Sequence, residues 1–362
     1  MPNRRKVLVS GTAVAAAAAT GGAAHATAPR QSAVGPRRIA VRDELAPLKE
    51  AFVGRMDIDS LVHPLSYSIV EYWGMSQAKI DAWNRGVGRP FRDMLDPAET
   101  KAVEHQMESL VSLYEAHGVR VHRPRQLTRY EDEFVTRGHA ELYTRDTVVV
   151  VGNTAVETTP MMPSRRKEIF GLRETLTARL AADPDAGHVA MPQPPPTVPD
   201  HRVPESPGPF LEGGDLFQLG DDILVGNSGL ASNSAGVAWL RRQFPDRRVH
   251  EVGLRRPWLH LDCVLSIIRP GLVMCYRDGL VDGLPEPIAD WEVIDATREE
   301  AHALGCNTMA LAPNKVVIAR EHTRLIRQLR RRRVDVISEF EFGAVCALGG
   351  GIRCVTSPLR RG

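Results

Sequence analysis

Cys354 lies near the end of the 362-residue chain, in the stretch "ALGGGIRCVTSPLRR" at residues 347–361 and shortly after three glycines. A thiol is a useful nucleophile only as the thiolate, and it needs a basic or cationic neighbour to become one. The remaining sequence must supply that neighbour. Without one, a small buried core residue is the simpler interpretation of this cysteine.

A histidine and an acid two residues apart are the first candidate partners. The stretch "WLHLDCV" contains His260 and Asp262, and on a strand these two side chains would share one face while Cys263 points to the other. Such a face could present a base beside a carboxylate. A half-solvated antiparallel strand would show the same alternation, and for this stretch alone it is the better explanation.

Two further acidic stretches stand next to apolar runs. In "FLEGGDLFQLG", Glu212 and Asp215 flank two glycines, which permit close backbone approach or φ values closed to other residues. In "LYTRDTVVVVGN", Asp146 stands at the entry to a buried run. Taken singly, a solvated glycine turn and a residue leading into a strand would explain both stretches.

These residues form a chemically coherent set, because each stands at the edge of a different apolar segment. A cysteine, a histidine and several carboxylates suit a cationic, planar substrate. Two carboxylates can hold a guanidinium through paired, charge-assisted hydrogen bonds. Another acid can orient and charge the histidine. The thiolate would then attack the central carbon of the guanidinium.

The segments that must position these side chains recur along the chain. Five short β-branched stretches bounded by turn formers predict buried strands, and most are followed by a helical stretch and a second strand. The first helix is the clearest, since Asp96 can cap it, Pro97 fits its first turn and Gly118 can end it. The fourth unit has only a weak, short linker. The five stretches are residues 48–55, 146–153, 221–228, 269–276 and 314–321.

Five strand–helix–strand units predict one quasi-repeating domain. Radial repetition would bring the strand ends around one axis, whereas a single open sheet covered by helices is the competing architecture. The proline-rich stretch 191–209 should lack regular structure, either as a plain surface linker or as a rim loop beside the site.

The composition is that of an ordinary globular protein, with 43% hydrophobic and 25% charged residues. The net charge of +2 gives no general case for nucleic-acid binding, and we expect the basic stretch 324–336 to be a solvated helix face. Five cysteines at irregular spacings, without a CxxC pair, indicate neither a disulfide framework nor a zinc site. The four cysteines other than Cys354 are interpreted as small core residues.

The N-terminus has the features of a twin-arginine export segment. Arg4 and Arg5 precede an alanine-rich run, and Ala24-His25-Ala26 has the form of a cleavage site. We therefore expect residues 1–26 to be an export segment, 27–40 a flexible linker and 41–362 a single catalytic domain. The protein would then be secreted or held in the cell envelope, or cytoplasmic if this segment is not functional. No other stretch is long and apolar enough to span a membrane.

Several motifs in this order resemble the amidinotransferases, namely the glycine and inosamine-phosphate amidinotransferase group of the guanidino-modifying superfamily that includes arginine deiminase. The likeness covers nearly all of residues 41–362. It is carried by "RDTVVVVGNTAVETTPMMPSRRKEIFGLR", "FLEGGDLF", "WLHLDCVLSIIRPGLV" and "LGGGIRCVTSPLRR". It implies an α/β fold, a five-bladed, pseudo-symmetric propeller of ββαβ modules, and a covalent amidino-cysteine intermediate.

The resemblance also implies roles for individual positions. Cys354 corresponds to the nucleophile and His260 to the general acid and base. Glu212 matches the acid that supports the histidine, while Asp146 and Asp262 match the pair that grips the guanidinium. Three further candidates for substrate binding are Asp215 beside the glycines, Asn307 in "GCNTMAL", and Arg277, which lies two residues from the position of an arginine that grips the substrate carboxylate.

One departure from the family leaves the acceptor open. The amidinotransferases carry Asp-Ala-Ala where this chain has Glu212-Gly213-Gly214, and "EGGD" is instead the form of the arginine deiminase and dimethylargininase-type hydrolases. Export is also unusual for an enzyme of intracellular metabolites. Amidino transfer to an amine is the first hypothesis, hydrolysis with water is the second, and a non-catalytic binding protein is the third.

The same chemistry determines which cofactors and partners we expect. No metal or organic cofactor is implied, because the nucleophile is covalent and charge activates the electrophile. The expected partners are a small guanidino donor and an amine acceptor, without nucleic acid or stable membrane insertion, and a homodimer is left open.

Overall fold

The computed structural model describes residues 38–197, 199–205 and 207–362. The described residues form one compact unit. The expected export segment and most of the expected linker lie outside the described residues. The linker was predicted to reach residue 40, but Ile39 is already buried and its N–H donates to Asp183 Oδ2 at 2.7 Å. Among the described helices, none is long and apolar enough to cross a membrane.

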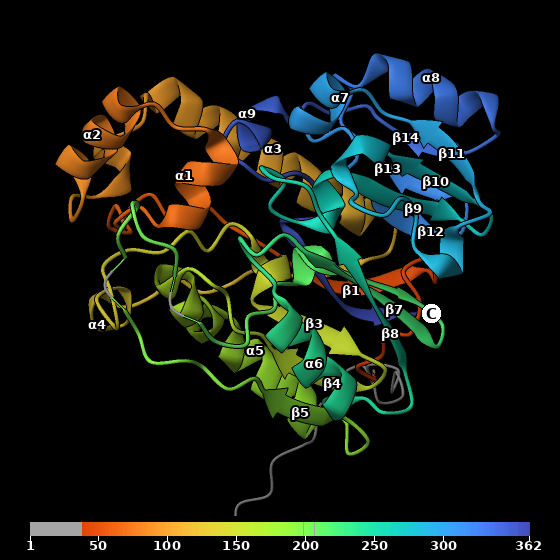
Figure 1. Ribbon diagram of the computed structural model, residues 1–362, viewed down its shortest axis with the longest axis horizontal. Coiled ribbons are helices and arrows are strands. Elements are labelled where there is room, and N and C mark those ends of the chain that lie inside the picture. The colour runs from red at the N-terminus through yellow and green to blue at the C-terminus, as the bar shows by residue number, and fades with distance from the viewer. Residues whose placement is uncertain (1–37, 198, 206) are drawn as a thin grey trace, which may run out of the picture. The chain divides into compact units, whose positions relative to one another are not determined.

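Five three-stranded sheets form the blades of a five-bladed α/β propeller (Figure 1). In every blade the middle strand pairs antiparallel with one neighbour and parallel with the other. The competing architecture, one open sheet, is therefore wrong. The strand orders are β15-β1-β2, β3-β4-β5, β6-β7-β8, β11-β10-β9 and β12-β13-β14. The bounds are β1 Leu48–Val53, β2 Arg120–His122, β3 Val148–Val151, β4 Thr154–Glu157, β5 Gly187–Ala190, β6 Leu216–Leu219, β7 Asp222–Asn227, β8 Arg248–Gly253, β9 Leu265–Arg269, β10 Leu272–Cys275, β11 Glu292–Asp295, β12 Met309–Ala312, β13 Lys315–Val317, β14 Asp335–Ile337 and β15 Thr356–Arg361.

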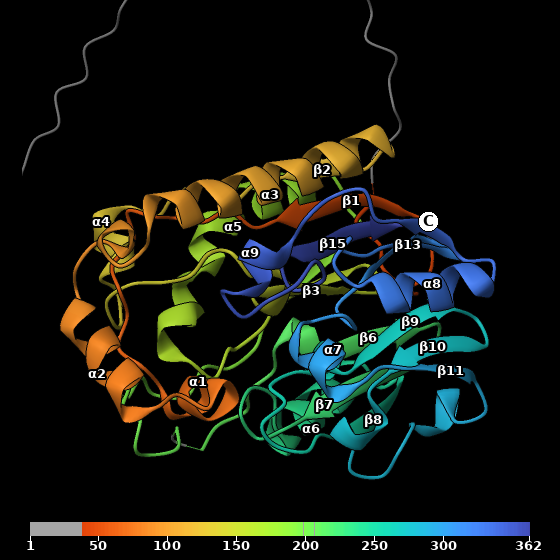
Figure 2. The ribbon, with the colours of Figure 1, turned by 90° about the horizontal axis from the view of Figure 1, so that it is seen from above.

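Helices cross between the second and third strands of four blades, as the repeating pattern predicted. Asp96 Oδ1 accepts a hydrogen bond from the N–H of Ala98 and so caps α3, and Gly118 has φ +74° just beyond its end. Figure 2 shows α3 lying along β1 and β2. These four helices are α3 Pro97–Ala116, α5 Ile169–Ala181, α6 Ser234–Gln243 and α8 Thr323–Arg331. The shorter helices are α1 Tyr67–Trp73, α2 Gln77–Gly86, α4 Arg129–Asp132, α7 Arg298–His302 and α9 Gly343–Cys346.

The fourth blade differs, since only two 3-10 turns, Arg277–Gly279 and Glu286–Ile288, lie between β10 and β11. This is the unit whose linker was predicted to be weak and short. The described part of 191–209 contains no strand or helix, in agreement with its proline content. The sequence pattern thus predicted both the regular and the irregular connections.

Each blade contains one strand more than the strand–helix–strand units read from the sequence. In the first blade this strand is β15, which pairs antiparallel with β1 from Leu48↔Arg361 to Val53↔Thr356. The C-terminal segment therefore closes the ring against the first strand of the chain. That closure matters for the site, because Cys354 lies immediately before β15.

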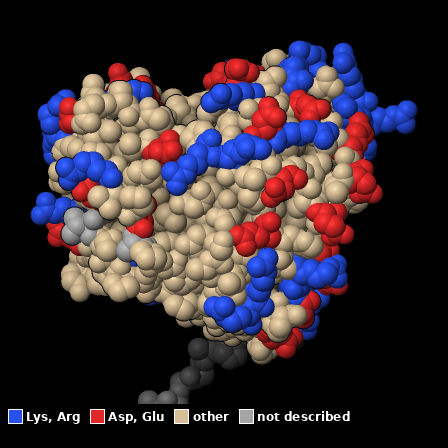
Figure 3. Space-filling view, in the orientation of Figure 1, with Lys and Arg blue, Asp and Glu red and all other residues tan. Residues whose placement is uncertain are grey.

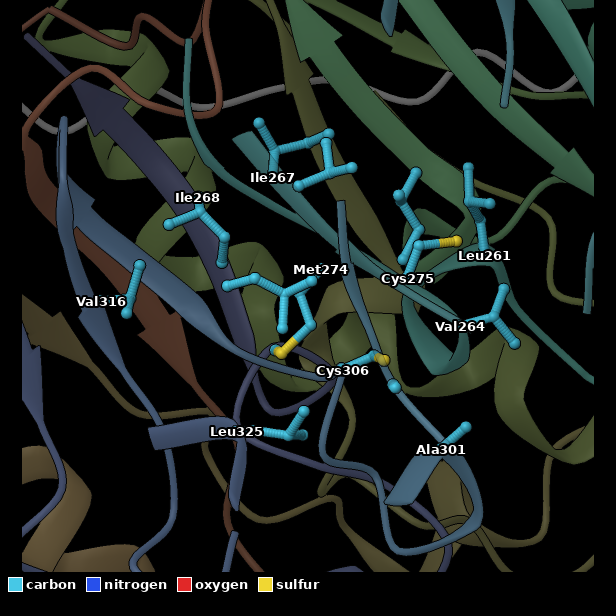
Figure 4. Packing of buried hydrophobic residues seen from close by; sticks show 14 of the residues in the cluster. Leu261, Val264, Ile267, Ile268, Met274, Cys275, Ala301, Cys306, Val316 and Leu325 are labelled. Atoms are coloured by element: carbon cyan, nitrogen blue, oxygen red, sulfur yellow. The ribbon is translucent and has the colours of Figure 1, made fainter. Parts of the chain in front are cut away.

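Buried apolar side chains fill the space between neighbouring blades and their helices. In the largest cluster, Cys275 and Cys306 pack among Met274, Leu261 and Leu325 (Figure 4). Both cysteines are small core residues, as expected, and Cys263 is also buried, whereas Cys346 is only half-buried.

The basic stretch 324–336 is a solvated helix face, as the sequence indicated. Leu325, Ile326 and Leu329 of α8 are buried, whereas Arg327, Arg330 and Arg331 are exposed. Figure 3 shows Lys and Arg side chains gathered where α8 lies in Figure 1, with Asp and Glu side chains beside them.

Candidate active site

Cys354 is held by one asparagine in the loop between α7 and β12. The side chain of Cys354 is buried, and Asn307 Nδ2 lies 3.1 Å from its Sγ. Asn307 Oδ1 accepts hydrogen bonds from the N–H groups of Arg353 and Cys354, at 2.8 and 3.3 Å. Asn307 therefore fixes both the backbone turn and the sulfur, which is a positioning function that the sequence did not specify.

The three glycines before Cys354 are explained by close packing. Gly349 has φ +102°, a conformation that other residues rarely adopt. A Cβ at Gly350 would lie 2.3 Å from the ring of Tyr143, and a Cβ at Gly351 would lie 2.6 Å from Asn307 Oδ1. The backbone passes too close to its neighbours here for any side chain.

His260 does not lie on a strand, so the predicted alternation in "WLHLDCV" is wrong. His260 is extended, Leu261–Cys263 form a 3-10 turn, and β9 begins only at Leu265. The turn nevertheless directs His260 toward acids from other blades. Its Nε2 lies 3.0 Å from Glu212 Oε2 and 3.9 Å from Asp146 Oδ1.

The neighbouring carboxylates keep His260 protonated at neutral pH. Burial alone would lower the pKa of His260, but the carboxylates of Asp146 and Glu212 raise this pKa to about 10. An imidazolium at this position is a general acid ready to protonate a departing amine.

Glu212 and Asp146 are both fixed by backbone donors. Glu212 Oε1 accepts from the N–H of Met161 at 3.0 Å, and Asp146 Oδ1 accepts from the N–H of Gly214 at 2.8 Å. A Cβ at Gly214 would lie 2.8 Å from the ring of His260 and 3.0 Å from Asp146 Oδ1. The glycines of "EGGD" thus let the backbone reach the acid and the imidazole together.

Arg165 is a site residue that the sequence analysis missed. Its side chain is buried, and Nη1 lies 2.9 Å from Asp146 Oδ2 and 3.3 Å from Glu212 Oε2. Burial would raise the pKa of Asp146, but His260 and Arg165 hold it below its usual range. The motif "SRRKE" contained this arginine, but charged runs are normally solvated, so nothing in the sequence marked it as buried.

A second missed arginine supports Asp262 behind the thiol. Asp262 Oδ2 accepts from Arg353 Nη1 at 3.1 Å, and Arg353 Nε donates to Glu44 Oε1 at 3.1 Å. The guanidinium carbon of Arg353 lies 3.7 Å from the ring centroid of Phe217. Burial raises the pKa of Asp262, and Arg353 opposes that shift.

The thiol of Cys354 stays protonated in this arrangement. Both carboxylate oxygens of Asp262 lie near Sγ, at 3.8 and 3.9 Å. Burial and then the charge of Asp262 raise the pKa of Cys354 well above its usual value. A cation must therefore enter beside the sulfur before the thiolate becomes favourable.

One cavity of about 270 Å³ reaches the thiol, the imidazole and two of the acids, since Cys354, His260, Glu212 and Asp146 all line it. The opposite wall comes from the segment between β1 and α3, which includes α1 and α2. Its apolar lining residues are Met56, Leu61, Leu65, Ile69, Trp73, Trp83, Phe91, Met94 and Leu95. The far side of the cavity is therefore largely apolar.

Of the five predicted substrate-binding residues, only Asp146 lines this cavity. Asp262 and Asn307 lie behind it against Cys354 Sγ, whereas Asp215 and Arg277 contact neither the cavity nor the sulfur. Asp215 is buried behind the site, where Oδ1 accepts from the N–H of Leu261 at 2.8 Å and supports the turn after His260. Arg277 follows β10 at the surface and lies 2.7 Å from Asp295 with more than half of its side chain exposed (55%). Proximity in sequence suggested both residues, but Asp215 supports the site from behind and Arg277 faces solvent.

Comparisons with known proteins agree with this geometry. A sequence profile described as arginine deiminase matches residues 287–361. A putative inosamine-phosphate amidinotransferase 2 of Streptomyces griseus is 26% identical over 349 residues, covering 89% of this chain and 97% of that protein. An N(G),N(G)-dimethylarginine dimethylaminohydrolase of Streptomyces coelicolor is 33% identical over 135 residues, covering 37% of this chain and 44% of that protein.

Solved structures show the same fold. An amidinotransferase of Microseira wollei from the saxitoxin biosynthetic pathway has a TM-score of 0.72 at 22% identity and covers 89% of this chain and 97% of its own. An inosamine-phosphate amidinotransferase of Streptomyces griseus has a TM-score of 0.73 at 24% identity, with coverage of 90% and 97%.

The five-bladed fold and the buried cluster of cysteine, histidine and acids define a guanidino-modifying type of protein. The chain is similar to proteins of the arginine deiminase-related superfamily. Within that superfamily, its likeness to amidinotransferases extends over nearly the whole chain, whereas its likeness to the dimethylarginine hydrolase covers 37% of it.

Proposed function

We propose that this protein is an amidinotransferase, which moves an amidino group from an arginine-like donor to an amine through a covalent amidino-cysteine intermediate. The observation that carries this proposal is the convergence of Cys354, His260, Glu212 and Asp146 on one buried cavity. These four residues lie in four different connections, before β3, β6, β9 and β15, so only the folded chain brings them together.

Substrate binding uses charge. Asp146 at the cavity and Asp262 behind the sulfur offer carboxylate oxygens to a guanidinium, which brings a positive charge next to Cys354. That charge lowers the pKa of the thiol, so Cys354 releases its proton to solvent as the substrate binds and becomes a thiolate. In this way the substrate itself activates the nucleophile.

In the first half-reaction, the thiolate of Cys354 forms a bond to the guanidinium carbon. The protonated His260 gives its proton to the leaving nitrogen, the C–N bond breaks and a neutral amine departs. The amidino group remains on sulfur as a cation, and His260 becomes neutral. Asp146 and Asp262 stabilise the positive charge throughout this step.

In the second half-reaction, an acceptor amine enters and attacks the amidino carbon. Neutral His260 takes a proton from the attacking nitrogen, and the C–S bond breaks to regenerate the thiolate. A new guanidinium leaves with the acceptor. Glu212 keeps His260 oriented through both proton transfers, because its carboxylate lies 3.0 Å from Nε2.

The apolar wall of the cavity favours transfer over hydrolysis. A hydrolase must admit water to the amidino carbon, whereas a transferase gains from excluding it. The "EGGD" motif was the sequence feature that suggested hydrolysis. However, the close contacts of Gly214 with His260 and Asp146 explain why glycine stands at this position, whichever acceptor the enzyme uses. Hydrolysis remains the second candidate function because of that motif.

Product analysis separates the two reactions. The purified protein is incubated with arginine, agmatine or methylated arginines, each with and without a panel of primary amines that includes glycine. Ornithine together with a new guanidine, formed only when an amine is present, supports transfer. Citrulline formed without any amine would establish hydrolysis instead. Cys354→Ala is the inactive control, and half-buried Cys346→Ala is the matched active control.

We also propose that residues 1–26 direct export by the twin-arginine route. The support is the pair Arg4 and Arg5 before an alanine-rich run. Replacing both arginines by lysine should retain the protein in the cytoplasm, as measured by cell fractionation. Unchanged distribution of the double variant would contradict export by this route.

A further inference from the structure

A second buried cluster of ionisable groups lies beside the same cavity and takes no part in the amidino-transfer steps proposed above. It consists of Asp57, just beyond β1, and of His139 and Glu141, in the loop before the 3-10 turn Thr144–Asp146. The side chains of Asp57, His139 and Glu141 are 4%, 0% and 1% exposed. Asp57 and His139 also line the cavity.

The three side chains point at one another. His139 Nε2 lies 3.5 Å from Asp57 Oδ2 and 3.9 Å from Glu141 Oε2. One nitrogen or oxygen of each residue lies within 4.8 Å of those of the other two. On the opposite side of the ring, Nδ1 lies 2.6 Å from Asp132 Oδ1. That contact fixes the orientation of the ring and directs Nε2 toward Asp57 and Glu141.

Polar atoms in this cluster lack hydrogen-bond partners. Within the part of the chain that the structure describes, His139 Nε2 and both carboxylate oxygens of Glu141 have none. A buried polar atom without a hydrogen-bond partner destabilises the folded chain, and it does so more strongly when it is charged. Three such atoms on two neighbouring side chains indicate that a ligand satisfies them together.

The charges indicate that the ligand is a cation. Asp57, Asp132 and Glu141 place three carboxylates around one imidazole. Lys167, the cation next to them, donates its ammonium hydrogen bonds to the backbone carbonyls of Asp132 and Thr136. The carboxylates are therefore left in excess in a buried region.

We propose that Asp57, His139 and Glu141 bind a divalent metal ion of the zinc or manganese type, with His139 Nε2 as the nitrogen ligand. Imidazole and carboxylate together suit such ions. Bonds of about 2.0–2.2 Å place neighbouring ligand atoms roughly 3.3 Å apart, so small side-chain shifts bring the observed spacing into range. Asp132 behind the histidine is the carboxylate that typically orients a metal-binding imidazole.

The other cluster with a similar composition does not share these features. Asp146, Glu212 and His260 also lie within 4.8 Å of one another. There, however, the acids accept hydrogen bonds from Arg165, Met161 N–H and Gly214 N–H. A metal would have to displace Arg165 there. At the second cluster it would meet His139 Nε2 and both Glu141 oxygens, which lack hydrogen-bond partners among the described residues, although Asp57 Oδ1 already accepts from Gln126.

The test measures metal content directly. Full-length protein is stripped with a chelator, equilibrated with Zn²⁺ or Mn²⁺, and passed through a desalting column. Wild type should retain about one ion per chain and gain thermal stability with that ion, since a ligand that binds only the folded state stabilises it. Glu141→Gln and Asp57→Asn should lose both the ion and the gain, while still folding in the absence of metal.

Two controls locate the ion. His188→Ala removes an exposed histidine, which pairs with Glu157 at 3.1 Å, and should retain the ion. Glu212→Gln alters the reaction centre and should retain it as well. Substitution with Co²⁺ should give weak bands typical of nitrogen and oxygen ligands, whereas a thiolate band would place the ion on a cysteine and contradict the proposal.

Two other outcomes would overturn the metal site. If wild type retains no more metal than Glu141→Gln, the proposal is wrong. If primary diamines stabilise wild type but not Glu141→Gln, while metal ions stabilise neither, the cluster binds an organic ammonium group instead. None of these readouts depends on amidino transfer, so the proposed function and this site can fail separately.

Discussion

Two buried histidines border one cavity, each surrounded by carboxylates, and they differ in how completely those carboxylates are paired. Acids raise the pKa of His260 to about 10 and that of His139 to about 11, against burial in both cases. Around His260, the acids accept hydrogen bonds from an arginine and from backbone N–H groups. Around His139, Glu141 accepts none among the described residues.

This difference separates two kinds of chemistry built from the same residue types. A fully paired cluster keeps its geometry while a proton moves on and off the imidazole, which acid–base catalysis requires. A cluster with vacant, buried acceptors is completed by a positive ligand. The pairing of the acids, rather than the presence of histidine and carboxylate, is therefore the property to test.

The largest effect is expected from removing the nucleophile. Cys354→Ala should lower amidino transfer at least ~10³-fold, because the covalent step cannot occur. The fold should persist, since the change removes only a sulfur from the end of the cavity. Rates come from ornithine release and folding from the melting temperature. Activity within tenfold of wild type would exclude Cys354 as the nucleophile.

The next effect concerns the acid that supports His260. Glu212→Gln removes a charge that raises the pKa of His260, so it should cost roughly 10²–10⁴-fold in kcat/KM. The pKa of His260 then falls, so His260 loses its proton at a lower pH. The alkaline limb of the pH–rate profile should therefore shift to lower pH. If the rate falls but the alkaline limb stays at the same pH, Glu212 does not set the pKa of His260 and only maintains the structure of the site. Glu141→Gln is the comparison variant and should leave the limb in place.

Replacing Asn307 tests whether an uncharged side chain contributes to catalysis by positioning the sulfur of Cys354. Asn307→Ala removes the amide that lies 3.1 Å from Sγ and should lower kcat about 10–100-fold with little change in KM. Asn227→Ala, which removes a half-buried asparagine bonded to Ser234 and Glu251 away from the site, is the matched control. A rise in KM at constant kcat would instead assign Asn307 to substrate binding.

We expect the smallest effect from replacing Asp215, and this substitution tests the direction in which stability changes with pH. Burial raises its pKa from 3.8 to about 7. Because the folded state holds this proton more tightly than the unfolded state, the ionised form costs stability, and that cost grows as pH rises from about 4 through 7. Asp215→Asn keeps the oxygen that accepts from Leu261, so it should raise the melting temperature by a few degrees at pH 8 but not at pH 4. Exposed Asp246→Asn should change it at neither pH.

The sequence predicted the parts of the fold that local patterns encode. The β-branched runs and capped helices identified strands and crossing helices in all blades but the irregular fourth. The sequence units did not include the additional strand of each blade. That strand is defined by its pairing with a neighbouring strand rather than by a local pattern. β15 is the clearest case, since its partner β1 lies at the other end of the chain.

The site was predicted in the same partial way. Cys354, Glu212 and Asp146 were identified from acids and a thiol next to glycines and strand ends, and His260 from its motif despite the wrong strand. Arg165 and Arg353 were missed because a buried arginine looks the same in sequence as a solvated one. The cluster at Asp57, His139 and Glu141 was missed because two distant chain segments without a shared motif create it.

The most direct test of the central claim is the mass of the Cys354 peptide. Wild-type protein is mixed with arginine in the absence of an amine, quenched in acid and digested. The peptide containing Cys354 should carry one additional amidino group, and a chase with an acceptor amine should remove it as the new guanidine appears. Turnover of arginine without any such adduct, or an adduct on another cysteine, would contradict covalent amidino transfer at this site.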